Sequence, residues 1–155
     1  MENRVFRDTM GKFATGITVV TTESEGNIHG MTVNSFMSVS LEPKLVAISI
    51  DEKASMHTLL PQTRKFTVSF LKDDQQKLSM IFAKQLIEET SIEFDRLDGQ
   101  PVLKDALAAI SCEVTDSLKA GDHTIFIGEV TGLTKKDGDP LLYFGGKYRN
   151  LEKIE

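Results

Sequence analysis

The sequence predicts a mainly β protein, organised as a small, closed or partly open antiparallel barrel with two or three short helices at its ends. About seven segments are rich in β-branched residues or alternate between apolar and polar residues, as strands do. Most of these segments follow one another through short polar links, which favour antiparallel neighbours. The sequence lacks the regular alternation of strands and helices that a doubly wound α/β sheet requires.

The first half of the chain begins with a predicted helix and continues with predicted strands. Apolar residues near helical spacing indicate the helix over residues 5–15, and Gly16 is expected to end it. A polar turn containing Gly26 separates the first two strands, and Pro43 breaks the third. The fourth strand is nearly all apolar, which indicates that both of its faces are covered. The predicted strands are residues 17–22, 28–33, 38–41 and 45–50.

The second half adds one helix and the remaining strands. Apolar side chains share one face of the predicted helix 73–83, with Asp73 or Asp74 as its N-cap. The acidic stretch 84–100 is expected to be irregular. Residues 119–122 give a hairpin signal between two long strands. The predicted strands are residues 66–71, 110–118, 123–133 and 141–144.

Length and composition are those of a single domain, residues 1–155, with 18 Lys and Arg against 23 Asp and Glu and a net charge of −5. This balance does not favour general binding to nucleic acid or to an anionic membrane. No apolar run is long enough for a membrane span, and the first residues lack the features of a signal peptide. The single cysteine, Cys112, is expected to be buried and inert, and a cytoplasmic location is expected.

Missing motifs exclude several kinds of catalytic site. There is no Gly-x-Gly-x-x-Gly after a strand, no Walker A sequence and no Gly-x-Ser-x-Gly nucleophile elbow. The three histidines lack metal-ligand spacing and one thiol cannot build a metal cage, so no metal site is expected. The carboxylates lack the apolar surroundings of paired acid–base catalysts and are interpreted as surface charges.

Two candidate segments carry polar groups beside predicted strands. Residues 30–40 place small hydroxyl and amide side chains at a strand end, where they either present donors to a flat polar ring or form an Asn-Ser turn. In residues 51–60, Ser55 can cap a short helix, with Lys53 beside its start and Thr58 on its first turn. Such a helix start can hold a phosphate, and the alternative is an ordinary capped helix.

Two further candidates lie near the C-terminus. His123 begins a strand directly after a tight turn, so its ring is expected at the rim of the barrel. There it contacts a bound ring or only stabilises the turn. Residues 142–149 place two tyrosines and an arginine beside flexible glycines, which suits a ligand-covering tail and equally a plain strand and turn.

Together, these segments make the chain similar to the flavin reductase-like family, whose fold is the FMN-binding split barrel. That fold is an antiparallel split β-barrel with Greek-key-like strand order. In length, the chain resembles the reductase components of two-component flavin-dependent monooxygenases. The resemblance covers nearly the whole chain and is carried by residues 6–21, 30–36, 38–43, 121–130 and 143–148.

The resemblance implies an NAD(P)H:flavin oxidoreductase that works as a homodimer, takes NADH or NADPH as reductant for FMN or FAD, and can supply a partner flavin-dependent oxygenase. His123 would position the nicotinamide, and Tyr148 or Arg149 would help to close the pocket. The phosphate would be held by Lys53, Ser55 and Thr58. The flavin ring and ribityl chain would be lined by Thr32, Val33, Asn34 and Ser35, continued by Ser49, Ile50 and Asp51.

Two departures from the family pattern touch these residues. Ala54 stands where the family often has a second serine, which removes one phosphate donor, and Val33 replaces a smaller alanine, which would tighten the wall. Two alternatives stay open at this stage. One is a non-catalytic or electron-carrying FMN protein of the same barrel fold, and the other is a split-barrel enzyme that uses a deazaflavin or a pyridoxal-type phosphate.

Overall fold

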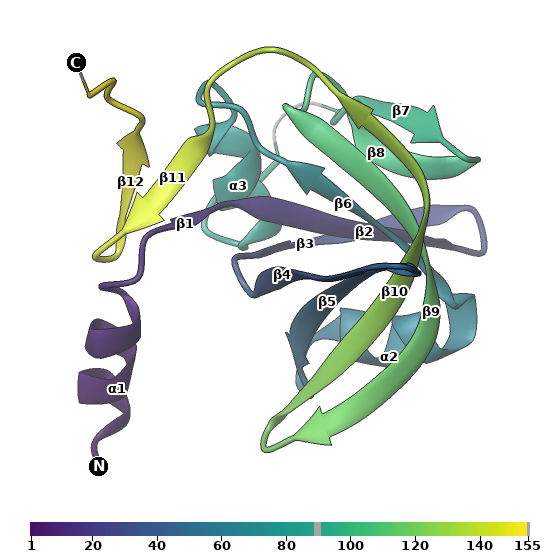
Figure 1. The fold of residues 1–155 in the computed structure, drawn as a ribbon, viewed down its shortest axis with the longest axis horizontal. Helices are drawn as coiled ribbons and strands as arrows, with labels where there is room; N and C mark the ends of the chain where they lie inside the picture. Colours follow the sequence, from purple (N-terminus) through teal and green to yellow (C-terminus); the bar gives the residue numbers. More distant parts are fainter. Residues whose placement is uncertain (89–90, 155) are drawn as a thin grey trace.

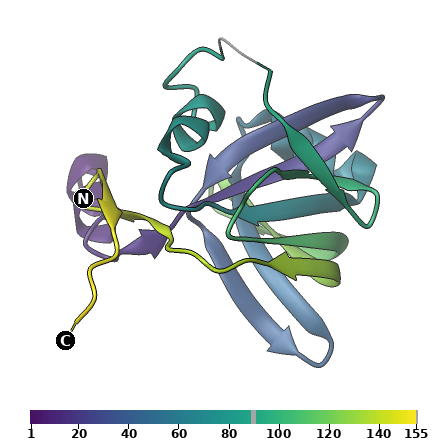
Figure 2. The ribbon, with the colours of Figure 1, turned by 90° about the horizontal axis from the view of Figure 1, so that it is seen from above.

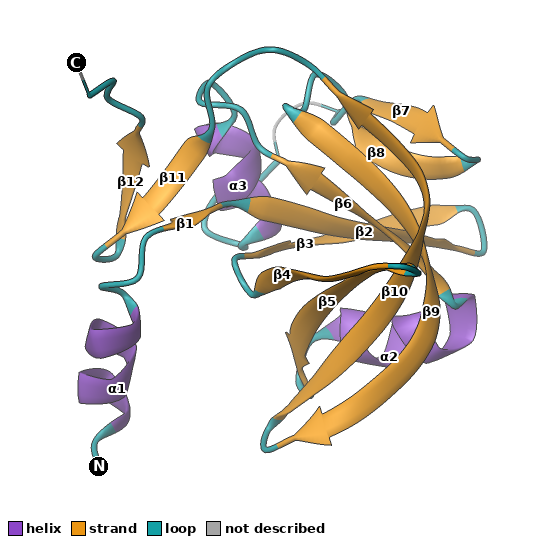
Figure 3. Cartoon of the chain, in the orientation of Figure 1, coloured by secondary structure: helices purple, strands orange, loops and turns teal. Residues whose placement is uncertain are grey.

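The structure is a computed structural model that describes residues 1–88 and 91–154. Its helices and strands are shown in Figure 1 and, coloured by type, in Figure 3. The predicted antiparallel, mainly β architecture with three short helices is confirmed. The helices are α1 (Asn3–Met10), α2 (Ser55–Thr63) and α3 (Gln76–Phe82). The strands are β1 (Thr15–Gly16), β2 (Thr18–Ser24), β3 (Asn27–Val33), β4 (Phe36–Leu41), β5 (Lys44–Asp51), β6 (Lys65–Phe70), β7 (Phe94–Leu97), β8 (Gln100–Leu103), β9 (Ala108–Ala120), β10 (His123–Lys135), β11 (Leu141–Phe144) and β12 (Lys147–Asn150).

Seven strands form the main sheet, in the order β3-β2-β6-β9-β10-β5-β4, and every neighbouring pair in it is antiparallel. Figure 1 shows this sheet strongly curved, with α2 set across one end of it. The inner face of the sheet packs its apolar side chains into one core, which Met56 and Leu60 of α2 complete. Because these two side chains are almost fully buried, the start of α2 is held in a fixed place beside β5.

A second, smaller sheet, β1-β11-β12, lies apart from the main one together with α1 (Figures 1 and 2). Its inner side joins a separate cluster around Leu71 and Leu141, where Tyr143 and Tyr148 pack edge to face with ring centroids 5.4 Å apart. No residue of α1 is buried. Among residues 1–88 and 91–154, the N-terminal helix therefore contributes no side chain to either core cluster.

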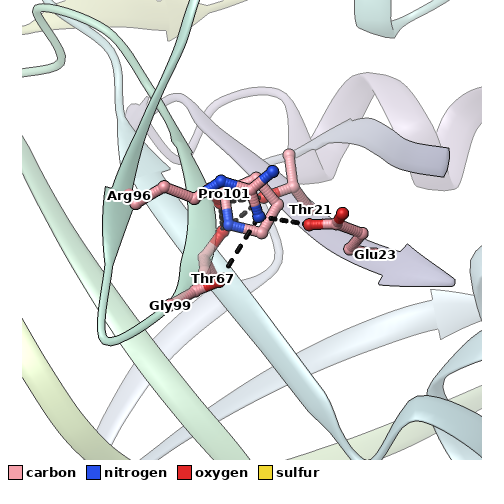
Figure 4. A network of polar contacts seen from close by, with 6 residues as sticks. All are labelled: Thr21, Glu23, Thr67, Arg96, Gly99 and Pro101. Carbon is pink, nitrogen blue, oxygen red and sulfur yellow. Dashed lines mark hydrogen bonds and ion pairs between the residues drawn. The ribbon is translucent and has the colours of Figure 1, made fainter. Parts of the chain in front are cut away.

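The β7–β8 hairpin is fastened across the main sheet by hydroxyl groups (Figure 4). Thr21 and Thr67 are cross-strand neighbours on β2 and β6, and each hydroxyl lies 2.7 Å from the main-chain oxygen of Pro101. The two hydroxyls also contact one another, so two protons serve three polar contacts. Arg96 of β7 adds an ion pair to Glu23 of β2. These contacts attach the hairpin to the face of the sheet opposite the main core.

Two helix boundaries differ from the prediction. Helix α1 ends at Met10 rather than near residue 15, because the amide of Gly11 closes the last turn on Arg7 and short turns follow. Residues 13–16 are thereby released from the helix. Helix α3 begins at Gln76, and neither Asp73 nor Asp74 caps it. Its preceding loop is organised instead by Gln75, whose side-chain oxygen accepts the main-chain N–H of Lys72 at 2.9 Å.

The prediction of an irregular stretch at 84–100 is wrong for its last residues, which form most of the β7–β8 hairpin. Residues 89–90 of that stretch lie outside the described residues. Asp98 and Gly99 both have positive φ (53° and 75°), as a two-residue hairpin turn requires. Gly145 and Gly146 (59° and 75°) make the same kind of turn, one of the two alternatives left open for residues 142–149, and the strand β12 after it was not predicted. The predicted hairpin at 119–122 is confirmed, with Gly121 and Asp122 between β9 and β10.

Gly128 of β10 is a site where the core tolerates no side chain. An added Cβ would lie 2.6 Å from Cζ of Phe66 and 2.9 Å from Cβ of Cys112, and both neighbours are fully buried. We therefore expect Gly128→Ala to lower the free energy of unfolding by about 1–3 kcal/mol, measured by urea denaturation followed by circular dichroism. Gly16→Ala is the matched control, because nothing lies within 4 Å of its added Cβ. An equal loss in both variants would contradict the packing argument.

Candidate active site

A cavity of about 740 Å³ opens between the small sheet and the β4–β5–β10 side of the main sheet. This volume is within the range of small-molecule and cofactor sites. Its walls are mostly apolar, with hydroxyl and amide groups among them. The lining residues are 13–16, Thr18, 34–38, 47–49 and Ile125. Three of the residues predicted to bind flavin, Asn34, Ser35 and Ser49, are among them.

The strand pair β5–β10 sets one wall of this cavity and its rim. Ser49 pairs with Ile125, and two residues further along, Asp51 pairs with His123. Side chains two residues apart in a strand share a face and are about 7 Å apart along it. His123 therefore stands at the rim of the cavity, on the face of the strand that Ile125 presents to it. Its ring is partly exposed, as expected from the sequence.

Directly after β5, the chain turns into α2 through a loop that Asp51 organises. The Asp51 carboxylate accepts the main-chain N–H of Lys53 at 2.8 Å, and its main-chain oxygen accepts the N–H of Ala54 at 3.0 Å. The prediction that Ser55 caps the helix is wrong. Ser55 is the first helical residue, and Ala54 holds the cap position without any side-chain hydrogen bond. No capping side chain occupies the start of α2, so its first N–H groups can meet a ligand oxygen, except that of His57, which donates to the main-chain oxygen of Ala54 at 3.0 Å.

Charged groups gather at this end of β5 and β10. The Nδ1–H of His123 donates to the Asp122 carboxylate at 2.7 Å. This hydrogen bond, together with the charge of His123 and a weaker effect of Lys53, holds the pKa of the Asp122 carboxyl below its ordinary value. On the other face of β10, Nε2 of His57 lies 2.8 Å from Oγ1 of Thr124, which ties the first turn of α2 to the strand that carries His123.

Other predicted site residues face away from the cavity. The Thr32 hydroxyl donates to the main-chain oxygen of Ser79 in α3 at 2.7 Å, so its side chain lies on the far side of β3. Val33 and Ile50 have their side chains in the main core, which leaves only their main chains for a ligand. The larger side chain of Val33 therefore fills the core and does not tighten the cavity wall.

The structure does not bring the two predicted C-terminal residues into the cavity. The Tyr148 hydroxyl lies 2.9 Å from Oγ of Ser79, and the Arg149 guanidinium lies over the ring of Phe144, 5.8 Å from its centroid. Both residues belong to β12, on the small sheet. Within one chain they support the second apolar cluster and the outer surface rather than the cavity lining.

Several lining residues were missed by sequence reasoning. Phe13, Thr15 and Gly16 were assigned to the first helix and its end, although they form an extended edge of the cavity. Met37 and Ile125 have the alternating pattern of ordinary strand residues, which does not show which face will meet a cavity. A useful signal was present at residues 11–16, where two glycines flank one aromatic side chain, because glycines there shorten the helix and expose what lies between them.

The buried thiol agrees with expectation. Cys112 is 1% exposed, and burial raises the pKa of its thiol to about 12. At neutral pH the thiol is therefore protonated and shielded from reagents, so it takes no part in the site. None of the helices in the described chain is long and apolar enough to cross a membrane.

Comparison with known proteins identifies the class. A family model described as "Flavin reductase like domain" matches residues 10–152. An NADH-dependent flavin reductase from Rhodococcus sp is 42% identical over 151 residues, covering 96% of this chain and 86% of that protein. The FMN reductase (NADH) SmoA from Agrobacterium fabrum is 42% identical over 153 residues, covering 97% of this chain and 87% of that protein.

Solved structures agree with the sequence relatives. The flavin reductase PheA2 superposes with a TM-score of 0.96 at 56% identity, covering 99% of this chain and all of the other. The flavin reductase of styrene monooxygenase from Pseudomonas putida S12 superposes with a TM-score of 0.91 at 38% identity, covering 97% and 99% of the two chains. That relative is the reductase component of a monooxygenase, as its name states.

These matches define the protein as an oxidoreductase that acts on flavin. The chain belongs to the flavin reductase-like family, and the resemblance seen in its sequence is confirmed. The predicted activity, reduction of a flavin by a nicotinamide, is likewise confirmed by what these relatives are. The alternative of a non-catalytic FMN carrier is not favoured by any of the relatives described above.

Proposed function

We propose that this chain reduces FMN or FAD with NADH, holding the flavin ring in the cavity beside β5 and the flavin phosphate at the start of α2. The observation that carries the proposal is the continuity of β5. Its residues 47–49 line the cavity, Asp51 stands at the rim, and the loop after it leads directly to Lys53 and the uncapped start of α2. A ring in the cavity thus has a phosphate seat at the end of the same strand.

The residues present fit a flavin. The cavity is large enough for a fused ring, and its wall combines apolar faces with the polar groups of Asn34, Ser35 and Ser49. When bound, the flavin supplies the hydride-accepting chemistry, as cofactors do in such enzymes. The protein then has to bind and orient the flavin and exclude water from it, and the apolar wall suits that task.

Each group of residues has a proposed role. The main chains of Thr32, Val33 and Ile50 add hydrogen-bonding groups beside the polar side chains of the wall. Lys53, Ser55 and Thr58 hold the phosphate together with the first N–H groups of α2, where the helix dipole favours negative charge. His123, at the rim and fixed by Asp122, positions the nicotinamide and transfers no proton to it.

NADH as the reductant and an oxygenase as the recipient are supported by the relatives. Both sequence relatives described above are named for NADH, and the styrene monooxygenase reductase is named for its partner enzyme. A cytoplasmic location belongs to the same proposal, since the one cysteine is a buried free thiol. The activity is tested with purified protein, each flavin and each nicotinamide, by following the absorbance band of the reduced nicotinamide.

We also propose that the working unit is a homodimer. Helix α1 has eight residues, none of them buried, and a helix this short is marginal in water without a packing partner. Val5, Phe6 and Met10 are more than half exposed on it, and Leu41 of β4 is 86% exposed. Apolar surface of this kind marks an interface, and a second copy is the occupant the family resemblance implies. Tyr148 and Arg149, on the small sheet next to α1, would then help to close the site between copies.

The homodimer has a direct test. Light scattering is expected to give a particle of twice 17.2 kDa for the wild-type protein. Leu41→Glu is expected to shift it towards monomer, because a buried unpaired carboxylate opposes association. Ile87→Glu is the matched control, since Ile87 is 88% exposed and lies on neither α1 nor β4. A fully active wild-type particle of 17 kDa would contradict the proposal.

Lys53 tests the phosphate seat. Lys53→Ala is expected to weaken FMN binding by about 1 kcal/mol, the lower end of charge-assisted contacts, because the side chain is exposed. Riboflavin has no phosphate, so its dissociation constant should not change. Both constants are read from quenching of flavin fluorescence, with Lys135→Ala at the other end of β10 as control. Equal weakening of FMN and riboflavin would remove Lys53 from the phosphate seat.

His123 tests the positioning role. His123→Ala is expected to lower kcat/KM for NADH by about 10- to 100-fold, the effect of one lost orienting contact, while flavin affinity stays within a few-fold. His29→Ala on β3 serves as the control histidine. Loss of flavin binding in a folded His123→Ala protein would make the residue a flavin ligand. Unchanged kinetics would reduce it to part of the β9–β10 turn.

A further inference from the structure

One cavity residue has a buried hydroxyl with no hydrogen-bond partner. Thr15 of β1 lines the cavity, yet its Oγ1 is buried and makes no hydrogen bond, the one such side-chain atom found across residues 1–88 and 91–154. A threonine hydroxyl offers one proton and two acceptor positions. Burying it unpaired destabilises the folded chain, so a buried orphan in a native structure calls for a physical reason.

The position of Thr15 in the fold shows how its hydroxyl could find a partner. Its backbone is fixed by pairing with Tyr143, and the next residue, Gly16, pairs with Leu142. Oγ1 is shielded from solvent although the residue lines an open cavity, so other atoms of Thr15 form its part of the wall. The methyl and hydroxyl groups share one Cβ, and a single staggered step of χ1 exchanges their places. The hydroxyl can thus take another direction without any movement of the strand.

Two hydroxyls close to this edge of the cavity are already committed to main-chain oxygens. The Ser35 hydroxyl donates to the main-chain oxygen of Ser49 at 2.8 Å, and the Thr18 hydroxyl donates to that of Val33 at 2.8 Å. Phe13, on the same edge as Thr15, is 80% exposed and offers an apolar ring face. A planar ligand against this edge would meet one aromatic face and one uncommitted hydroxyl.

We propose that Thr15 hydrogen-bonds the polar edge of the planar heterocycle that enters the cavity, an edge built from adjacent carbonyl and N–H groups. This inference rests on the proposed function, which supplies two planar heterocycles with such an edge: the flavin ring, and the nicotinamide ring through its carboxamide group. Binding turns the Thr15 hydroxyl towards the ligand and gives it the partner that the free protein lacks. The hydroxyl therefore stabilises the ligand-bound state and is not needed for folding.

Two substitutions separate these two states. Thr15→Val keeps the shape and removes the hydroxyl, so without ligand it should unfold at the same temperature as wild type or higher. With FMN it should bind about 5- to 20-fold more weakly if the flavin is the partner. If nicotinamide is the partner, KM for NADH at saturating FMN should rise by that factor instead. Thr15→Ser restores the hydroxyl and should return whichever constant had changed towards the wild-type value.

Thr22→Val is the control with the opposite pattern. The Thr22 hydroxyl is buried on β2 and already donates to Lys65 O at 2.7 Å, so this variant should lose stability and keep its ligand affinity. Two results would overturn the inference: a marked drop in the unfolding temperature of ligand-free Thr15→Val, or unchanged FMN affinity together with unchanged KM. If wild-type protein neither binds FMN nor oxidises NADH, the proposed function fails instead, which the wild-type measurements show on their own.

Discussion

The antiparallel register between β5 and β10 is the constraint on which the site depends. Seven residue pairs join the two strands, from Asp51 with His123 to Leu45 with Glu129. This register turns Ile50 and Phe126 into the core and Ser49 and Ile125 towards the cavity. A slip of one residue would send each side chain to the other face, burying serine and exposing the core. The same packing that stabilises the sheet therefore fixes the cavity wall, the rim histidine and the start of α2.

The apolar side chains of helices α1 and α2 differ in burial. The main core is closed by α2, whose Met56 and Leu60 are nearly inaccessible, while α1 contributes nothing to either core cluster. In a single copy, α2 is thus packed into the main core, and the N-terminal helix and the edge strand β4 remain largely exposed. Because the cavity opens between the small sheet and the β4 side, any partner that covered these elements would also border the ligand.

Sequence patterns predicted the strands of the main sheet because each is rich in β-branched residues or alternates between apolar and polar residues. Continuous β-branched or apolar runs mark β2 and β5, which are buried on both faces. Sequence patterns failed where a backbone contact decides the structure. The β7–β8 hairpin is set by Asp98 and Gly99 at positive φ, a signal that the acidic composition of residues 84–100 obscured. Ser55 is not the cap, because the helix begins one residue earlier than expected, after a turn in which the Asp51 carboxylate accepts the N–H of Lys53. The sequence does not tell which of these two side chains will organise the turn. Tyr148 and Arg149 lie outside the cavity of a single chain, on the small sheet, and a strand pattern does not tell which side of that sheet will pack.

The cavity wall is uncharged and its rim is charged, and this difference fits the chemistry of the family. No lining residue, among those the structure describes, carries a side chain that titrates in the physiological range; the wall offers hydroxyls, one amide, main-chain groups and apolar faces. The charged groups Asp51, Lys53, Asp122 and His123 all stand beyond it, at the end of β5 and β10. An enzyme whose cofactors carry the electrons needs no acid or base inside the cavity. In the proposed function, the cavity residues would affect the rate through the distance and angle at which they hold two rings, and the strand pairing of β5 with β10 would fix that geometry.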